Sequence, residues 1–226
     1  MLTIVPTPIG NLEDITLRSI SAFLEADYIA AEDTRRTSIL LRYLRVSRPL
    51  ISFHRHNEVS RTAELVAHIK GGYRVALSCD AGIPAISDPG YQLISACIQE
   101  GLPFTVLPGP SAVLTALVGS GLPCHKFYFA GFLPVKSGKR AAELRQAATR
   151  PWTSVYFESP YRLVVSLSIL TEICPSIPVC VAREISKKFE EYRRGTAGKV
   201  LAHFTVHPPK GEIVLLIHGN FSYPLE

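Results

Sequence analysis

The run from Val75 to Gly90 constrains the possible folds more than any other part of the chain. Its first three residues are β-branched or aliphatic, as in a strand that is buried on both faces of a parallel sheet. Asp80 follows, and the glycines and prolines after it prevent a regular continuation. In an open α/β sheet, ligands bind just outside the carboxyl ends of the strands, where Asp80 is expected. The run therefore predicts a buried strand followed by a ligand-binding loop.

Apolar, β-rich runs alternate with amphipathic segments of helical length along the whole chain. This alternation predicts an α/β fold with a mostly parallel sheet and helices on both of its faces. In the first half, we expect strands at 2–5, 28–31, 50–53, 75–77 and 104–107, and helices at 17–24, 39–44, 62–70 and 91–99. In the second half, we expect helices at 111–119 and 161–172, a third that ends near 148, and strands at 126–130, 154–157, 179–182 and 213–217.

A break at Gly121 and Pro123 is the best candidate for a domain boundary. It would divide the chain into an N-terminal α/β domain at 1–121 and a C-terminal α/β domain at 122–226. A length of 226 residues is enough for one large domain or for two of about 110 residues each. We therefore expect two domains.

The composition excludes several classes of protein. With 47% hydrophobic and 19% charged residues, the chain is globular rather than disordered. It contains no run of about 18 uncharged apolar residues and no signal-peptide pattern, so we expect a cytoplasmic protein without a membrane partner. Its five cysteines are odd in number and form no C-x-x-C pair, which disfavours disulfides and a zinc site. The net charge of +5 is compatible with a polyanionic partner but is common without one.

Acidic and basic residues follow the second expected strand, from Glu32 to Arg36. Asp33 or Thr34 can simply cap the next helix. Two acids followed by two arginines at a strand end also suit phosphate binding and acid/base chemistry. The residues alone leave these two interpretations equally open.

Polar residues also follow the third and fourth expected strands. The spacing of His54 and His56 suggests metal binding, but without a nearby cluster of ligands a hydrogen-bonding or RNA-contact role is favoured. Asp80 and Asp88 could form a metal-binding pair. The glycines and prolines between these two acids suit backbone contacts to a polar organic ligand better.

Charged residues follow two strands of the second half as well. A solvated rim of ion pairs is the ordinary explanation of such residues. Their position at strand ends makes a functional site an equal alternative for Glu158, Arg183, Glu184 and Lys187.

Eight motifs stand at 7–18, 31–35, 54–58, 80–90, 108–112, 131–134, 157–160 and 182–184. Together and in this order, they resemble the ribosomal RNA small subunit methyltransferase I family of the tetrapyrrole-methylase-like superfamily. The resemblance runs from about residue 3 to residue 219. It implies that the chain lacks the small helical C-terminal extension that many members carry after the last strand.

The resemblance implies a class III methyltransferase fold, with a mostly parallel sheet in the N-terminal domain and a mixed sheet in the C-terminal domain. It also implies a homodimer that binds S-adenosyl-L-methionine, the methyl donor, in the cleft between its domains and requires no metal. The implied reaction is 2′-O-methylation of a cytidine ribose in the decoding region of 16S rRNA, met as naked RNA or in the small ribosomal subunit. The residues implied to bind the donor are Pro8, Asp80, Gly82, Ile83, Ser111, Ala112, Phe157, Ala182 and Gly211.

Methyl transfer to a hydroxyl requires alignment of the two groups and a base for the hydroxyl proton. The candidates for this base are Glu32, Asp33 and Glu184. The candidates for substrate binding are three cations, which would hold phosphates beside the target ribose, and one histidine: Arg35, Arg183, Lys187 and His54.

Two other functions stay open at the level of sequence. A tetrapyrrole C-methylase would belong to the same superfamily. Against it, residues 7–11 replace the glycine-rich first loop of those enzymes, and binding of a porphyrinoid would not require the basic clusters. A catalytically silent RNA-binding module of ribosome assembly is the alternative outside the enzymes. The chain departs from the family's usual pattern at Arg55, Tyr161, Ser186 and His218.

Overall fold

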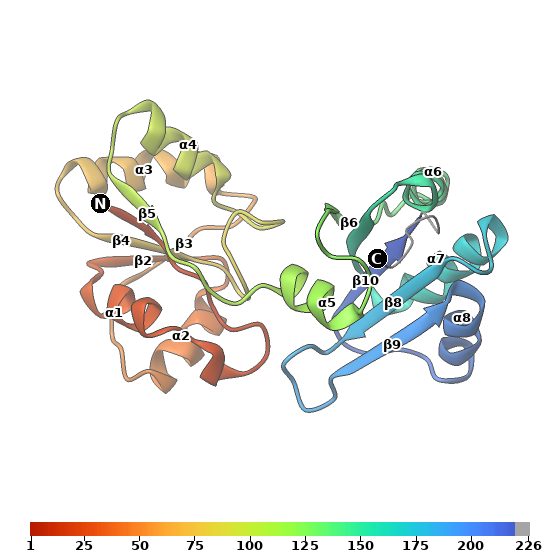
Figure 1. The fold of residues 1–226 in the computed structure, drawn as a ribbon. Helices are drawn as coiled ribbons and strands as arrows, with labels where there is room; N and C mark the ends of the chain where they lie inside the picture. The colour runs from red at the N-terminus through yellow and green to blue at the C-terminus, as the bar shows by residue number, and fades with distance from the viewer. Residues whose placement is uncertain (220–226) are drawn as a thin grey trace. The chain divides into compact units, whose positions relative to one another are not determined.

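The computed structural model describes residues 1–219. They form two compact units, the first made of residues 1–111 and the second beginning at Ala112. Each unit contains a five-stranded sheet with helices packed on it (Figure 1). The expected α/β fold with two sheets is therefore confirmed.

The sheet of the first unit is entirely parallel. Its strands, in spatial order, are β3 (Leu50–Ser52), β2 (Tyr28–Ala31), β4 (Val75–Ser78), β1 (Leu2–Ile4) and β5 (Phe104–Val106). Leu2 pairs with Val75 on one side and with Phe104 on the other. The run that begins at Val75 is thus a central strand, and it is buried along its whole length as predicted.

Helices cover both faces of this sheet (Figure 1). They are α1 (Leu17–Glu25), α2 (Thr34–Tyr43), α3 (Glu58–Lys70) and α4 (Tyr91–Gln99), with a short 3₁₀ helix at Leu12–Asp14. Phe23 of α1 and Leu40 of α2 share one core, whereas Leu65 of α3 and Leu93 of α4 share another. Burial of each of these side chains contributes about 1.5–3 kcal/mol.

The two helices that follow β2 and β3 begin earlier than the apolar pattern predicts. We expected starts at 39 and 62, but α2 begins at Thr34 and α3 at Glu58. Asp33 caps α2, because its carboxylate accepts the Arg35 N–H at 2.9 Å. The first turns of both helices are polar, so they show no apolar periodicity to mark where the helix begins.

The strand order creates a topological switch point between β1 and β4. These strands are neighbours, but the chain leaves β1 through α1 on one face and β4 through α4 on the other. Open α/β sheets bind ligands where adjacent connections diverge in this way. The two loops meet there: the Thr7 N–H donates to the Gly82 carbonyl at 2.9 Å, and the Gly82 N–H donates to the Thr7 carbonyl at 3.0 Å. Gly82 has φ +82°, a conformation that favours glycine.

The sheet of the second unit is mixed, as expected. Its strands, in spatial order, are β6 (Phe127–Phe132), β7 (Thr153–Glu158), β10 (Ile213–His218), β8 (Pro178–Arg183) and β9 (Glu191–Thr196). β6 and β7 are parallel, and the other neighbours are antiparallel. Because β10 runs opposite to both β7 and β8, the strands β6, β7 and β8 all end at the edge where β10 begins.

Three helices of the second unit share one core. They are α6 (Ser137–Thr149), α7 (Pro160–Ile173) and α8 (Ala197–Val206). Leu144 of α6, Leu167 of α7 and Phe204 of α8 are buried together. Tyr156 of β7 and Leu215 of β10 supply the sheet side of this core.

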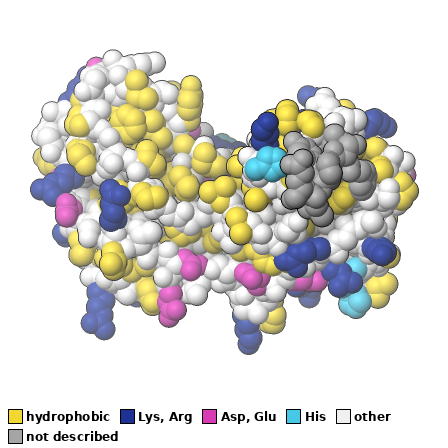
Figure 2. All heavy atoms as spheres, in the orientation of Figure 1, with side chains coloured by type: hydrophobic (Ala, Val, Ile, Leu, Met, Phe, Trp, Pro, Cys, Tyr) yellow, Lys and Arg dark blue, Asp and Glu magenta, His cyan; other side chains and the backbone are white. Residues whose placement is uncertain are grey.

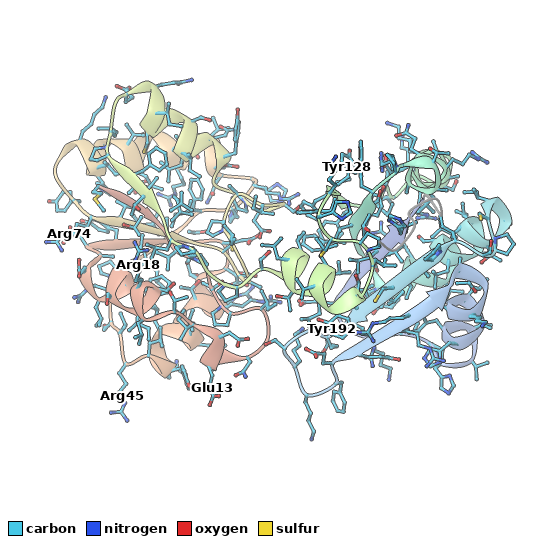
Figure 3. All side chains as sticks on the ribbon, viewed as in Figure 1. Glu13, Arg18, Arg45, Arg74, Tyr128 and Tyr192 are labelled. Carbon is cyan, nitrogen blue, oxygen red and sulfur yellow. The ribbon has the colours of Figure 1, made fainter. Side chains whose placement is uncertain are left out.

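A further helix, α5 (Ala112–Ser120), packs against β8, β9 and β10. Tyr192 of β9 is labelled in Figure 3. Gly119 lies so close to it that a Cβ at position 119 would overlap the Tyr192 ring. The Arg194 Nε donates to the Gly119 carbonyl at 3.1 Å. These contacts place α5 in the second unit, so the boundary between units precedes α5, whereas we expected it at 121, after this helix.

The cysteines behave as small residues rather than as a cross-linked framework. All five are free thiols, and Cys79, Cys97 and Cys180 are buried. Within residues 1–219, we find no helix that is both long and apolar enough to span a membrane.

Candidate functional site

Two acidic loops meet at the carboxyl ends of β2 and β4. The Asp80 N–H donates to the Glu32 carboxylate at 3.4 Å, and the Asp33 N–H donates to the Asp80 carboxylate at 3.1 Å. Arg36 forms an ion pair with Asp80 at 3.3 Å. The structure therefore brings the predicted Glu32, Asp33 and Asp80 together at the sheet edge where a ligand is expected.

Asp88 joins this acidic cluster from the far end of the β4 loop. Burial, followed by the negative charge of Glu32, raises the pKa of Asp88 to about 6. Burial also raises the pKa of Glu32; the charge of Asp80 adds to this effect, while the Asp80 N–H and the cations Arg55 and Arg36 oppose it. Glu32 and Asp88 therefore hold protons more strongly than ordinary surface carboxyl groups. Such groups are suited to accept a proton during a reaction.

Asp33 has the opposite environment, although it is adjacent to Glu32 in the sequence. Its carboxylate accepts the Arg35 Nε–H at 3.0 Å and lies 2.8 Å from another nitrogen of the same guanidinium. These hydrogen bonds to Arg35 lower the pKa of Asp33 to about 2. Asp33 is thus a stable anion that caps a helix, which makes it the weaker base of the two.

The first residue of α3 holds the end of the β4 loop in place. The Glu58 carboxylate accepts the Gly90 N–H at 2.9 Å and the Gln92 N–H at 3.2 Å. Gly90 is the N-cap residue of α4 and has no side chain with which to cap the helix. Glu58, the first residue of α3, therefore supplies the cap of α4 from another element.

The histidine motif at 54–58 is built around a tight turn. The His54 N–H donates to the Asn57 side-chain oxygen at 2.7 Å, and the Asn57 amide donates to the Ser52 carbonyl at 3.0 Å. The His54 Nδ1 is buried and has no hydrogen-bond partner among the described residues. No group of three His, Cys, Asp or Glu side chains in residues 1–219 is arranged to hold a metal ion. His54 thus stays a predicted contact to substrate.

The β4 loop adopts an unusual backbone conformation. Ala85 and Ser87 have φ values of +71° and +65°, and Gly90 has φ +140°. The Arg55 guanidinium donates to the Ser87 carbonyl. Positive φ at residues other than glycine costs on the order of 1–3 kcal/mol and is concentrated at ligand sites. The strain therefore supports the predicted role of this loop.

The loop after β5 approaches the other loops of the same edge. A Cβ on Gly109 would lie only 2.6 Å from the Pro6 Cβ, and a Cβ on Gly82 would lie 3.9 Å from the Pro110 carbonyl oxygen. Three loops thus converge at the switch point. They carry the predicted donor residues of the first unit: Pro8, Asp80, Gly82, Ile83 and Ser111.

Glu158, at the end of β7, anchors the start of α7. Its side chain is fully buried and forms an ion pair with Arg162 at 2.9 Å. Its carboxylate also accepts the Ser166 hydroxyl at 2.7 Å and the Ser159 N–H at 2.7 Å. Three partners compensate the free-energy cost of burying this carboxylate, and at a helix N-terminus the helix dipole also stabilises it. Glu158 is therefore a structural anchor and not part of a solvated rim.

Glu184, after β8, is also bound on several sides. Its carboxylate accepts the Glu212 N–H at 2.9 Å and lies 2.9 Å from the Lys187 Nζ. The Glu212 hydrogen bond, together with Lys187, lowers the pKa of Glu184. Gly211 has φ +84°, and any Cβ at this position would overlap the Glu184 carboxylate. Glycine at 211 thus leaves room for the Glu184 carboxylate, which is a stable anion.

The predicted phosphate-binding cations of this edge already have partners. The Arg183 Nε–H donates to Glu191 at 3.1 Å, and the Arg183 Nη1 donates to the Lys210 carbonyl at 3.2 Å. Lys187 also lies 3.0 Å from the Glu212 carboxylate. Their positive charge is therefore partly neutralised before any phosphate approaches.

Phe157 and Ala182 lie on either side of one residue of β10. Val214 pairs with Phe157 across β7 and with Ala182 across β8. The Phe157 ring packs edge-on against Phe129, with 5.1 Å between ring centroids. These two predicted donor residues thus form a row near the carboxyl edge of the second sheet.

Basic side chains do not gather in one patch on the face shown in Figure 2. Lys and Arg are instead scattered over both units on that face. Binding of a polyanion to this face would therefore depend on individual positions rather than on a broad field.

Sequence reasoning missed some partners at these edges. It did not predict that Arg36 binds Asp80 or that Glu58 caps α4. It considered Asp88 only as a metal ligand and not as a proton acceptor. The signal available for Glu58 was weak: a glycine at the start of a helix has no side chain with which to cap it, so another element can supply the cap.

Comparison with known proteins gives a consistent result. The model of the family Tetrapyrrole (Corrin/Porphyrin) Methylases matches residues 1–201. The ribosomal RNA small subunit methyltransferase I of Thermotoga maritima is 44% identical over 97% of this chain and 98% of its own length. The protein of that name from Hydrogenobaculum sp. is 45% identical over 96% of this chain and 94% of its length. The one from Halalkalibacterium halodurans is 42% identical over 97% of this chain but only 76% of its own length, so these relatives differ in length.

Solved structures of similar fold include the methyltransferase CobJ, with a TM-score of 0.71, 19% identity and coverage of 100% of this chain and 96% of that one. The cobalt precorrin-4 methyltransferase gives a TM-score of 0.70 at 15% identity, and the match covers 96% of this chain and 93% of that one. The uroporphyrin-III C-methyltransferase of Thermus thermophilus gives a TM-score of 0.65 at 21% identity, and the match covers 96% of this chain and 94% of that one. At such identities the likeness establishes the fold, which is the one expected.

Proposed function

The chain belongs to the tetrapyrrole methylase family, and on this premise we propose that it is an S-adenosyl-L-methionine-dependent methyltransferase of small-subunit ribosomal RNA. The observation that carries the proposal is the likeness, over nearly the whole chain, to relatives named ribosomal RNA small subunit methyltransferase I. The tetrapyrrole enzymes share the fold at 15–21% identity, which gives no reason to prefer a porphyrinoid substrate. The proposed reaction is 2′-O-methylation of a cytidine in the decoding region of 16S rRNA.

The edge of the first unit fits this methyl donor chemically. A sulfonium and an α-ammonium group are cations, and the cluster of Glu32, Asp80 and Asp88 offers carboxylate oxygens to such groups. Gly82, held at positive φ, brings backbone amide groups to the same edge. When bound, the donor supplies an electrophilic methyl group. The residues proposed to hold it are Pro8, Asp80, Gly82, Ile83 and Ser111 of the first unit and Ala112, Phe157, Ala182 and Gly211 of the second.

We assign the role of proton acceptor to Glu32 among the three candidates. Burial raises the pKa of Glu32, whereas the partners of Asp33 and Glu184 lower theirs. A carboxylate with a raised pKa is the stronger base, and the 2′-hydroxyl must lose its proton as the new bond forms. Asp33 and Glu184 then keep their charge and hold Arg35 and Lys187 in place.

On the RNA side, Arg35 is the most accessible of the proposed contacts, because 89% of its side chain is exposed. A guanidinium in this state can form charge-assisted hydrogen bonds to a phosphate. His54, Arg183 and Lys187 are proposed as further contacts, and the target nucleotide has to be unstacked to present its ribose. A homodimer is proposed on the family resemblance alone.

Replacement of the three acids tests the assignment of the base. We expect Glu32→Gln to lower kcat by about 10²–10⁴-fold, because the proton acceptor is removed. Calorimetry should show that this variant still binds S-adenosyl-L-methionine. In the matched variants Asp33→Asn and Glu184→Gln, kcat should fall by less than about tenfold, since these groups do not accept the proton. Unchanged turnover in Glu32→Gln with intact donor binding would show that Glu32 is not the base.

Mapping of 2′-O-methyl groups tests the reaction itself. In 16S rRNA from cells that lack the protein, we expect one methylated cytidine of the decoding region to be missing. An unchanged methylation pattern contradicts the proposed substrate. Absence of any heat of binding with S-adenosyl-L-methionine would instead indicate a catalytically silent RNA-binding module.

A further inference from the structure

Arg140 is a buried arginine that has no acidic partner among the described residues. Only 6% of its surface is exposed. Within residues 1–219, its buried Nε has no hydrogen-bond partner, and its Nη1 donates only to the Val135 carbonyl, at 3.4 Å. Buried arginines are nearly always paired, because an uncompensated charge in a protein interior is costly. The structure around Arg140 thus provides a cation without its anion.

This guanidinium lies at the N-terminus of its own helix, α6. Helical side chains point back towards the start of the helix, and the contact with Val135 places the Arg140 guanidinium beside the first turn. The first intrahelical hydrogen bond runs from the Arg140 N–H to the Lys136 carbonyl at 2.9 Å, so the N–H groups before it have no partner within the helix. No side chain of the described residues caps this end, and the first turn contains no acid.

The first turn of α6 is open to a ligand. Residues 135–139 are exposed, and a Cβ on Gly138 would meet no atom within 4 Å. Lys136 and Lys139 add two more positive charges to this turn. Free N–H groups, the positive end of a helix dipole and adjacent cations together favour an anion with several acceptor oxygens, such as a phosphate group.

The neighbouring helix shows what α6 lacks. α7 follows β7, the parallel neighbour of β6, and its N-terminus therefore lies at the same edge of the sheet. There Glu158 accepts the Ser159 N–H, and the Ser159 hydroxyl accepts the Tyr161 N–H. The protein fills the anion position of α7 with its own carboxylate, and it leaves the corresponding position of α6 without one among residues 1–219.

We propose that the N-terminus of α6, together with Arg140, binds a backbone phosphate of the RNA substrate. This inference rests on the proposed function. Phe132, at the end of β6, and Tyr161, in the first turn of α7, are 58% and 94% exposed at the same edge. Exposed aromatic rings beside a phosphate site are typical of surfaces on which unstacked bases of single-stranded RNA lie. An RNA strand is therefore a better match than an isolated phosphate metabolite.

Titration with inorganic phosphate tests the anion site without RNA. In the full-length protein, the backbone amide signals of residues 137–139 in a ¹H–¹⁵N spectrum should shift saturably with phosphate but not with chloride at equal ionic strength. Arg140→Met and Gly138→Asp should abolish the shift, by removing the cation and by placing a competing carboxylate in the first turn. Arg145→Met, which removes an exposed arginine of the same helix, is the matched control and should leave the shift intact.

RNA binding tests the identity of the ligand. With a 16S rRNA fragment, Arg140→Met should weaken affinity by at least about tenfold and reduce the slope of log K against log salt by about one. Thermal unfolding separates this role from a structural one, because removal of an unpaired buried charge should leave Tm unchanged or raise it.

A missing phosphate shift in the wild-type protein, or a shift that persists in Arg140→Met, overturns the site. A normal phosphate shift with an unchanged RNA salt slope overturns the assignment to RNA. Should the wild-type protein fail to bind rRNA at all, the proposed function fails, and the phosphate titration still decides whether the anion site exists.

Discussion

The acids at the two sheet edges follow strands in the same way, yet they have opposite environments. In the first unit, burial raises the pKa of Glu32 and brings that of Asp88 to about 6. In the second unit, Glu158 and Glu184 each have a cation within 3 Å and a backbone N–H. At the first edge, Glu32 and Asp88 are thus suited to exchange protons. At the second edge, Glu158 and Glu184 fix the backbone, as Asp33 does at the first. The partners of an acid, and not its place after a strand, decide which role it has.

Sequence spacing explains only half of this contrast. Glu158 and Arg162 are four residues apart, and Glu184 and Lys187 are three apart, so the pairing is local. Glu32 also has arginines three and four residues later. Those arginines bind Asp33 and Asp80 instead, because the strand order brings Asp80 beside the loop after β2.

The largest effect on stability is expected at the second edge. Glu158→Ala should lower the free energy of unfolding by about 3–5 kcal/mol, because it leaves Arg162 and Ser166 without their shared partner. Urea denaturation measures this loss. The matched variant Glu64→Ala breaks an exposed pair with Arg61 and should cost less than about 1 kcal/mol. Similar losses in the two variants would remove the distinction between anchoring and surface acids.

A smaller, pH-dependent effect is expected at Asp88. Its pKa is about 6 in the folded protein and 3.8 ordinarily, so the folded state binds more protons between these values and stability falls as the pH rises through this window. The full shift corresponds to about 3 kcal/mol. Solvent screening of this partly exposed carboxyl reduces the expected effect to roughly 1 kcal/mol.

Asp88→Asn tests this expectation by removing the titration. The variant should match the wild-type protein below pH 4 and be more stable above pH 6. Denaturation at a series of pH values measures the difference. Parallel stability curves for the two proteins between pH 4 and 6 would contradict the raised pKa of Asp88.

The smallest effect is expected at Asp33. Its pKa is lowered to about 2 by Arg35, so its stabilising charge is present above the ordinary value of 3.8 and is lost only as the pH falls through about 2. Asparagine is as good an N-cap as aspartate. Asp33→Asn should therefore leave Tm at pH 7 nearly unchanged. A large drop in Tm would show that the exposed pair with Arg35 matters more than solvent exposure suggests.

Much of the fold was predictable because apolar periodicity reports burial. The central strand at Val75 and the alternation of strands and helices follow from this periodicity. The early starts of α2 and α3 do not, since their first turns are polar. The placement of α5 depends on Tyr192 and Arg194, which are more than 70 residues away along the chain and leave no local signal.

The candidate site was predictable as a place but not as a set of partners. Asp80 and Gly82 stand at the switch point because parallel strands end at a common edge, which is a general property of the fold. The ranking of Glu32 above Asp33 depends on burial and on the side to which Arg35 turns. The lack of an acidic partner for Arg140 within residues 1–219 depends on which carboxylates come near it in space. Neither property can be read from the order of residues.

The cap that Glu58 provides for α4 has a consequence for the dynamics of the molecule. The N–H groups of Gly90 and Gln92 are bonded to a carboxylate that belongs to α3, some 30 residues earlier. Their hydrogen exchange with solvent therefore requires the Glu58 carboxylate of α3 to leave this end of α4, and not merely the fraying of one helix. These two amides are thus local reporters of whether the β4 loop opens on its own or only together with the helix that precedes its strand.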